Sequence, residues 1–200
     1  MKIQSETKKR LARMISGVVN PFLVSTTLIF LVLRESTDNM NQCMNWFMLS
    51  IAISLVPLFV FTLILLKLRK IDNLFITVRV QRYKVYSITV VLLGIDCIVL
   101  YILAAPKLLI ATFTVIFIID IIFAIVNRYW KISIHAATIT AAVTALFVLY
   151  GIKAAASLPL IPLVGWARVE IEHHSVLQVL VGGVSASFVL IVVYNLFQLI

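Results

Sequence analysis

The stretch KLLIATFTVIFIIDIIFAIVN, residues 107 to 127, decides the class of fold. It is a continuous apolar run of about 20 residues, the length at which an α-helix crosses the hydrocarbon core of a bilayer. Its apolar residues do not alternate with polar ones, and it is much longer than the ~10-residue strands of a membrane barrel. We therefore expect a transmembrane helix here.

Similar runs fill most of the chain. Only 12% of its 200 residues are charged and 62% are hydrophobic, whereas about a quarter of the residues of a soluble domain are charged. The sequence predicts an all-α, polytopic transmembrane helical bundle of six to seven spans that forms one membrane domain over residues 1–200. The other runs lie at 15–33, 45–66, 85–105, 132–152, 155–169 and 174–198.

Two of these runs leave alternatives open. The run 155–169 is short and carries Pro159 and Pro162, so it forms either a Pro-containing span or a re-entrant segment. The run 15–33 follows a basic segment, as in a signal peptide, but no small-residue cleavage site follows it. We interpret it as a retained first span preceded by a basic cytoplasmic segment, residues 1–14.

Charge bias orients the chain, because Lys and Arg near span ends stay on the cytoplasmic side. The net charge of +9 is then mainly a property of one membrane face, and no soluble basic surface remains for nucleic acid. A cytoplasmic N-terminus in the cell membrane leaves Arg34, Lys107 and Lys153 outside. It places fourteen cations inside: Lys2, Lys8, Lys9, Arg10, Arg13, Lys67, Arg69, Lys70, Arg79, Arg82, Lys84, Arg128, Lys131 and Arg168.

The same face collects residues suited to binding an anion. The guanidinium groups of Arg79, Arg82 and Arg168 match phosphate oxygens, and a helix that begins near Ser133 adds free N–H groups. An ordinary cytoplasmic loop that holds the topology is the alternative for Arg79 and Arg82. These residues predict a phosphate-binding site.

Histidines next to this site suggest the chemistry. One of them, His135 or His174, can attack phosphorus while the other protonates the leaving oxygen, which requires neither metal nor cofactor. Gln178 lies four residues after His174, so on a helix it can reach the imidazole. A hydrogen-bonded structural histidine is the alternative for His135, and we interpret His173 as an interfacial residue. A metal cluster of His173 and His174 with Glu170 and Glu172 lacks the His-x3-His spacing of helical zinc sites.

The pattern resembles the type 2 phosphatidic acid phosphatase superfamily of lipid phosphate phosphatases. Its signature is Lys-x6-Arg-Pro, Pro-Ser-Gly-His and Ser-Arg-x5-His-x3-Asp. Here the third motif corresponds to Ala167-Arg168, five residues, His174, three residues and Gln178, and the second to Ile132-Ser133-Ile134-His135. The resemblance covers residues 67–198, which we call the phosphatase-like core.

The resemblance implies a role for each matched residue. Arg168 and Arg82 would bind phosphate, His174 would be the nucleophile that forms a phosphohistidine, and His135 would protonate the leaving group. The implied activity is hydrolysis of a lipid phosphate or diphosphate, of polyprenyl type in preference to phosphatidic acid. The alternatives are a catalytically impaired lipid-phosphate-binding protein and a lipid phosphotransferase.

Departures from the signature include Phe75, Tyr83, Ile134, Ala167 and Gln178. Phe75 replaces the lysine of the first motif, and Arg79, Lys84 or Lys131 would have to supply that cation. Gln178 replaces the aspartate, and its amide oxygen can accept a histidine N–H but cannot offset an imidazolium charge. Asp96 and Asp120 lie inside predicted spans. We expect their carboxyls either to hydrogen-bond polar groups on neighbouring helices or to position residues of the phosphate-binding site.

Overall fold

The computed structural model describes residues 2–74, 76 and 78–200, and these residues form helices, turns and loops without a β-strand. The predicted all-α class is confirmed. The chain divides into two compact units, one of Met1–Leu28, Ile132–Val192 and Ile200, the other of Ile29–Lys131 and Val193–Leu199. Each unit is described by itself, and the phosphatase-like core contributes residues to both.

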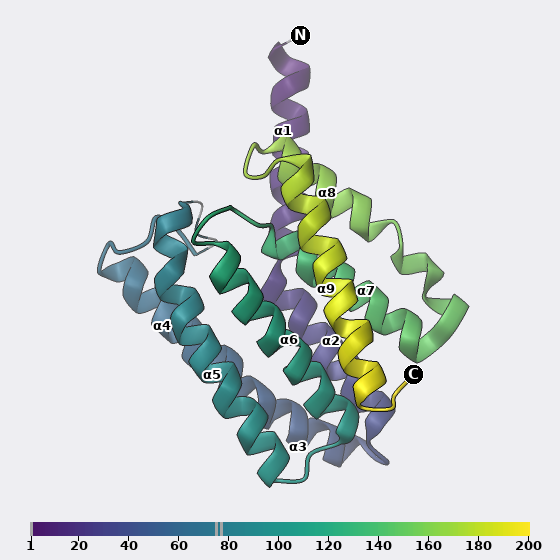
Figure 1. The fold of residues 1–200 in the computed structure, drawn as a ribbon. Helices are drawn as coiled ribbons and strands as arrows, with labels where there is room; N and C mark the ends of the chain where they lie inside the picture. The colour runs from purple at the N-terminus through teal and green to yellow at the C-terminus, as the bar shows by residue number, and fades with distance from the viewer. Residues whose placement is uncertain (1, 75, 77) are drawn as a thin grey trace. The chain divides into compact units, whose positions relative to one another are not determined.

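Figure 1 shows the helices in chain order. Their bounds are α1 Lys2–Val18, α2 Pro21–Ser36, α3 Met40–Ser50, the π-helix η1 Ile51–Leu55, α4 Val56–Lys67, the 3₁₀ turn η2 Arg79–Gln81, α5 Arg82–Ile102, α6 Lys107–Val126, α7 Ile134–Tyr150, the 3₁₀ segment η3 Gly151–Ser157, α8 Leu160–Glu170 and α9 Val176–Leu196.

Among the described residues, six helical stretches are long and apolar enough to cross a membrane: Glu6–Ser36, Met40–Lys67, Arg79–Ile102, Lys107–Val126, Ile134–Ser157 and Val176–Leu196. Large apolar side chains such as Phe59, Ile98 and Phe188 are exposed along them, as a lipid-facing surface requires. The structure fits a multi-pass membrane protein.

The first predicted run is two helices rather than one. The chain bends at Val19 and Asn20, between α1 and α2. Asn20 Oδ1 accepts the Leu23 N–H at 3.1 Å, and Pro21 occupies the first position of α2. An Asn cap followed by Pro is a strong helix-start signal, because Pro needs no N–H partner there. The basic segment 1–14 is itself mostly helical, as part of α1.

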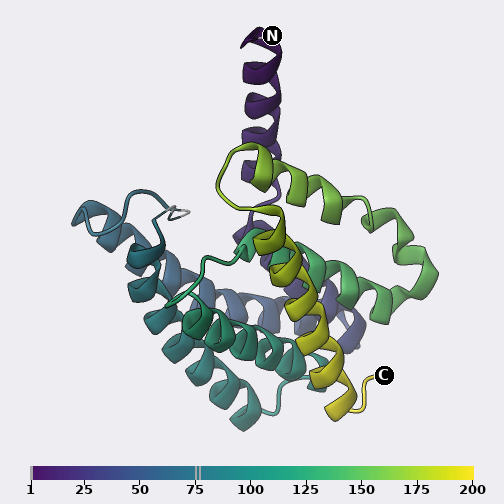
Figure 2. The ribbon, with the colours of Figure 1, turned by 45° about the horizontal axis from the view of Figure 1, so that its top comes forward.

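The run 155–169 covers the end of η3 and all but the last residue of α8, and α8 has only 11 residues. At 1.5 Å per residue α8 is about 16 Å long, which is too short to cross a hydrocarbon core of about 30 Å. Its prolines are compatible with the helix, since Pro159 precedes its first residue and Pro162 lies in its first turn. Figure 2 shows η3 and α8 returning the chain from the end of α7 to the start of α9.

The core of the first unit lies between α7 and α8. Ile139 and Val143 of α7 are buried against Val164 of α8, and further apolar side chains surround them: Val19, Val24, Phe147, Leu160 and Ile161. The other side of α7 faces α9, where the hydroxyls of Thr144 and Ser187 lie 2.8 Å apart.

Two glycines of α9 allow its backbone to approach α7. A Cβ added to Gly182 would lie 2.9 Å from the backbone oxygen of Ser133, and one added to Gly183 would lie 2.9 Å from the Thr140 hydroxyl. Small residues permit such close approach between membrane helices. The start of α7 is therefore fixed against the second turn of α9.

The second unit is built around the packing of α5 against α6 and of α4 against α5. Leu65, Ile71 and Ile76 form a buried cluster where α4 ends and the loop to α5 folds back. At another point in this unit, the hydroxyls of Thr112 and Tyr194 are both buried and lie 2.8 Å apart.

Substitution of Gly182 by alanine should lower the stability of the folded protein by about 1–3 kcal/mol, because a backbone oxygen cannot move aside as a side chain can. Thermal unfolding of the purified protein in detergent measures the change. Gly17→Ala is the matched control, since nothing lies within 4 Å of its added Cβ. It should leave the melting temperature unchanged or raise it slightly, because Ala favours helix over Gly. Equal melting temperatures for the two variants would contradict this account of α9 packing.

Candidate functional site

The C-terminal end of α8 is closed by a backbone motif centred on Arg168. The N–H of His173 donates to the Arg168 carbonyl at 3.3 Å, and the N–H of Glu172 donates to that of Val169 at 2.9 Å. These two bonds define a Schellman motif, in which the residue after the cap adopts the left-handed conformation. That residue is Glu172, with φ of 58°, where glycine is usual.

The N-terminal end of α9 is closed by a reciprocal pair of hydrogen bonds. Gln178 N donates to Ser175 Oγ at 3.3 Å, and Ser175 N donates to Gln178 Oε1 at 3.2 Å. This is a capping box, Ser-x-x-Gln directly before an apolar run. The sequence contains this signal, although above we interpret Gln178 only as a partner of the His174 imidazole.

His174 lies between the two caps and is buried. Its N–H also donates to the Arg168 carbonyl, at 3.2 Å, and its Nδ1 lies 3.2 Å from Gln178 Oε1. The predicted contact between His174 and Gln178 is thus confirmed, although His174 precedes α9 rather than belonging to it.

The tautomer of His174 follows from this contact. The Ser175 N–H can only donate, so Gln178 turns its oxygen, not its amide nitrogen, to this point. His174 Nδ1 must then carry the proton that it donates to the same oxygen. The lone pair of the neutral imidazole is consequently on Nε2.

Arg168 is only 3% exposed, and its guanidinium is held from two sides. Nη1 donates to Ser16 Oγ of α1 at 2.7 Å, and Nη2 lies 3.1 Å from His173 Nδ1. Because a guanidinium only donates, His173 Nδ1 must accept, so the two neighbouring histidines have opposite tautomers. The sequence pattern predicts neither Ser16 nor His173 as a partner of Arg168.

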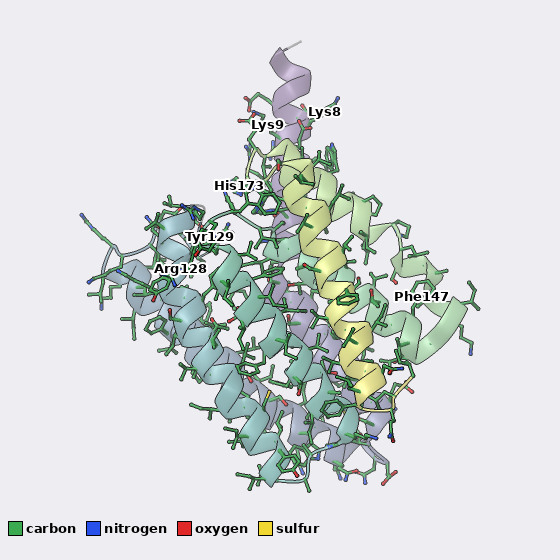
Figure 3. The ribbon with its side chains drawn as sticks, viewed as in Figure 1. Lys8, Lys9, Arg128, Tyr129, Phe147 and His173 are labelled. Atoms are coloured by element: carbon green, nitrogen blue, oxygen red, sulfur yellow. The ribbon has the colours of Figure 1, made fainter. Side chains whose placement is uncertain are left out.

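An ion pair joins α1 to the same corner. Lys9 Nζ lies 2.6 Å from Glu172 Oε1, between residues 163 positions apart. The hydrogen bond from Lys9, and then the charge of its ammonium, lowers the pKa of the Glu172 carboxyl. Figure 3 shows Lys8, Lys9 and His173 at this end of the first unit.

The start of α7 meets the start of α9. Ser133 caps α7 by accepting the Ala136 N–H at 3.4 Å, and its own N–H donates to the Gln178 carbonyl at 3.4 Å. His135, in the first turn of α7, is buried. Two helix N-termini therefore lie together, and the positive ends of their dipoles favour an anion beside Arg168 and His174.

The predicted phosphate ligands Arg79 and Arg82 belong to the second unit. Arg79 Nη1 donates to the Asn127 carbonyl at 2.8 Å and also to the Arg128 carbonyl, while Asn127 Nδ2 donates to the Arg79 carbonyl at 3.1 Å. Arg79 thus caps the C-terminal end of α6, where a cation also complements the helix dipole. Arg128 and Tyr129 follow that end (Figure 3).

Arg82 is buried, and its Nε donates to the Ile76 carbonyl at 2.9 Å. This bond ties the loop before α5 to the first turn of that helix. Lys131 is the last residue of the second unit in its stretch of the chain, next to Ile132 and Ser133 of the first unit. Phe75, where the resemblance expects lysine, lies outside the described residues.

The two intramembrane aspartates are also in the second unit, Asp96 on α5 and Asp120 on α6. In the described part of the chain, Oδ2 of each carboxyl is buried and has no hydrogen-bond partner. No group of three or more His, Cys, Asp or Glu side chains suited to a metal ion occurs among the described residues.

Comparison with protein-family models, curated proteins and solved structures finds no match. The chemistry of the corner must therefore be argued from its own residues. They are a buried guanidinium, an imidazole whose Nδ1 donates to Gln178, and two adjoining helix N-termini.

The left-handed conformation of Glu172 can be tested by comparing glycine with alanine at that position. Both variants lose the ion pair with Lys9, but only glycine relieves the backbone strain, so Glu172→Gly should be more stable than Glu172→Ala by about 1 kcal/mol. Glu170, the last residue of α8, is the matched control, and there alanine should be the more stable. Melting temperatures of the four variants in detergent measure both differences. The same order at both positions would rule out the left-handed turn.

Proposed function

We propose that this chain is a metal-independent phosphatase that removes phosphate from a membrane lipid through a phosphohistidine on His174. The observation that carries the proposal is that a buried arginine and a buried histidine meet at one corner, where the Arg168 carbonyl accepts the His174 N–H and His174 Nδ1 lies 3.2 Å from Gln178 Oε1. The resemblance of this segment to the lipid phosphate phosphatases supports the same conclusion.

The reaction has two steps. His174 Nε2 attacks phosphorus, a P–N bond forms, and the bond from phosphorus to the lipid oxygen breaks as His135 protonates that oxygen. Water then attacks the phosphohistidine, His135 takes a proton from it, and the P–N bond breaks to release phosphate. Arg168 and the N-terminal N–H groups of α7 and α9 would stabilise the negative charge of the phosphoryl group in both steps.

The substrate would be a lipid phosphate or diphosphate, with a polyprenyl chain favoured, whose tail lies among the spans. The charge asymmetry of the chain favours a site at the cytoplasmic face of the cell membrane, on the same side as the N-terminus. The basic end of α1 would attract anionic headgroups to that face.

A lipid-phosphate-binding protein without turnover is the second candidate. Three contacts favour it: Arg79 and Arg82 bond backbone carbonyls, and Gln178 serves as a helix cap in place of a carboxylate. A binder needs the cationic Arg168 and the two helix ends, but it needs neither a nucleophile nor a charge partner for an imidazolium.

Replacing His174 by alanine should lower phosphate release by at least about 10³-fold, because the change removes the group that forms the covalent intermediate. The assay uses purified protein in detergent with EDTA, a panel of lipid phosphates, and free phosphate as the readout. His173→Ala is the comparison. It should retain kcat within about tenfold and raise KM, since His173 only orients Arg168.

Each other outcome of this assay has a definite meaning. Wild-type protein that binds the lipids but releases no phosphate would favour the binder. Activity that requires added magnesium, or that survives in His174→Ala, would overturn the phosphohistidine mechanism.

Gln178→Glu should raise kcat by about tenfold, because a carboxylate of the same length keeps the two hydrogen bonds and also offsets the imidazolium charge that develops on His174. Gln178→Leu, which removes both bonds, should lower both kcat and the melting temperature. Phosphate release and thermal unfolding are measured on the same preparations. A slower Gln178→Glu enzyme with an unchanged melting temperature would show that added negative charge is unfavourable there.

A further inference from the structure

The helix that crosses from Met40 to Lys67 contains a π-helical turn, η1, at its centre. Val56 N donates to the Ile51 carbonyl, five residues back, and Pro57 has no N–H to donate. The carbonyl of Ile53 therefore lacks its ordinary donor four residues on. Turns of this kind inside α-helices are frequent at functional sites.

Two hydroxyls lie on one side of this helix, that of Ser50 directly before the turn and that of Ser54 within it. Ser50 is fully buried and Ser54 is 8% exposed, and their spacing of four residues places them on the same face. Most hydroxyls in this unit bond a carbonyl of their own helix, as Thr62 does to Leu58. Within the described residues, the hydroxyls of Ser50 and Ser54 have no hydrogen-bond partner.

Asp96 lies opposite this face. It is 1% exposed, about 21 Å along α5 from Arg82, and η1 packs against α5. Ser54 is near enough to interact with the Asp96 carboxyl, yet Asp96 Oδ2 and the Ser54 hydroxyl complete no hydrogen bond in the described structure. An intramembrane carboxylate is expensive and usually marks an ion or proton pathway.

We propose that Asp96, Ser50 and Ser54 form a binding site for a small monovalent cation such as sodium. All three groups are hard oxygen ligands, which suit a hard cation. A monovalent cation neutralises one carboxylate, whereas a divalent one would leave a net charge inside the membrane. Ser54 lies near the Asp96 carboxyl without a completed hydrogen bond, as two ligands of a common ion would.

The test is thermal unfolding of the purified full-length protein in detergent, in sodium chloride against choline chloride at equal ionic strength. Sodium at a hundredfold excess over its dissociation constant should raise the melting temperature of the wild type by about 5 °C. Asp96→Asn should abolish the rise. Asp120→Asn, the other intramembrane aspartate, is the matched control and should retain it.

Ser54→Ala is a second variant that tests the site if Asp96→Asn does not fold. It should need about tenfold more sodium for half of the maximal rise. A wild-type melting temperature that does not depend on sodium, or a rise that persists unchanged in a folded Asp96→Asn or in Ser54→Ala, would overturn the proposal.

Discussion

The carbonyl of Arg168 is the acceptor on which the corner between α8 and α9 depends. It accepts the N–H groups of both His173 and His174. These two bonds end α8 and fix the backbone at both histidines. The reciprocal cap of α9 begins immediately afterwards, at Ser175. Each residue from 171 to 175, between the two helices, donates its N–H to an acceptor in this corner.

Polar contacts of charged side chains join that corner to the rest of its unit. A guanidinium as buried as that of Arg168 needs hydrogen-bond acceptors, because desolvation without partners is costly. Ser16 supplies one acceptor from α1, and the Lys9–Glu172 pair joins the same two segments nearer the surface. Gly182 brings α7 close enough for its start to meet the start of α9. The tertiary contacts therefore converge on the polar end of the unit.

The spans could be predicted from the sequence because lipid requires long, continuous apolar runs, and the run at 107–127 coincides closely with α6. The helix start at Pro21 and the capping box at Ser175 could also be predicted, because both depend on local sequence signals. The pairing of Arg168 with Ser16 could not, since 152 residues separate them and no spacing rule relates them. The role of Arg79 could not be predicted for a different reason. A guanidinium that can bind phosphate can equally bind the carbonyls at a helix end.

The spacing of the third motif has two physical meanings at once. A helix that ends at Glu170 in a Schellman turn, followed by one that begins with a capping box, places an arginine, a histidine and a glutamine at the same intervals as the phosphatase signature. The spacing is therefore weak evidence of chemistry by itself. The caps, however, need only the backbone of Arg168 and one side-chain acceptor at Gln178. They do not require a buried guanidinium, nor an imidazole oriented with its lone pair on Nε2. Those two features are what the proposed chemistry uses and what helix capping leaves unexplained.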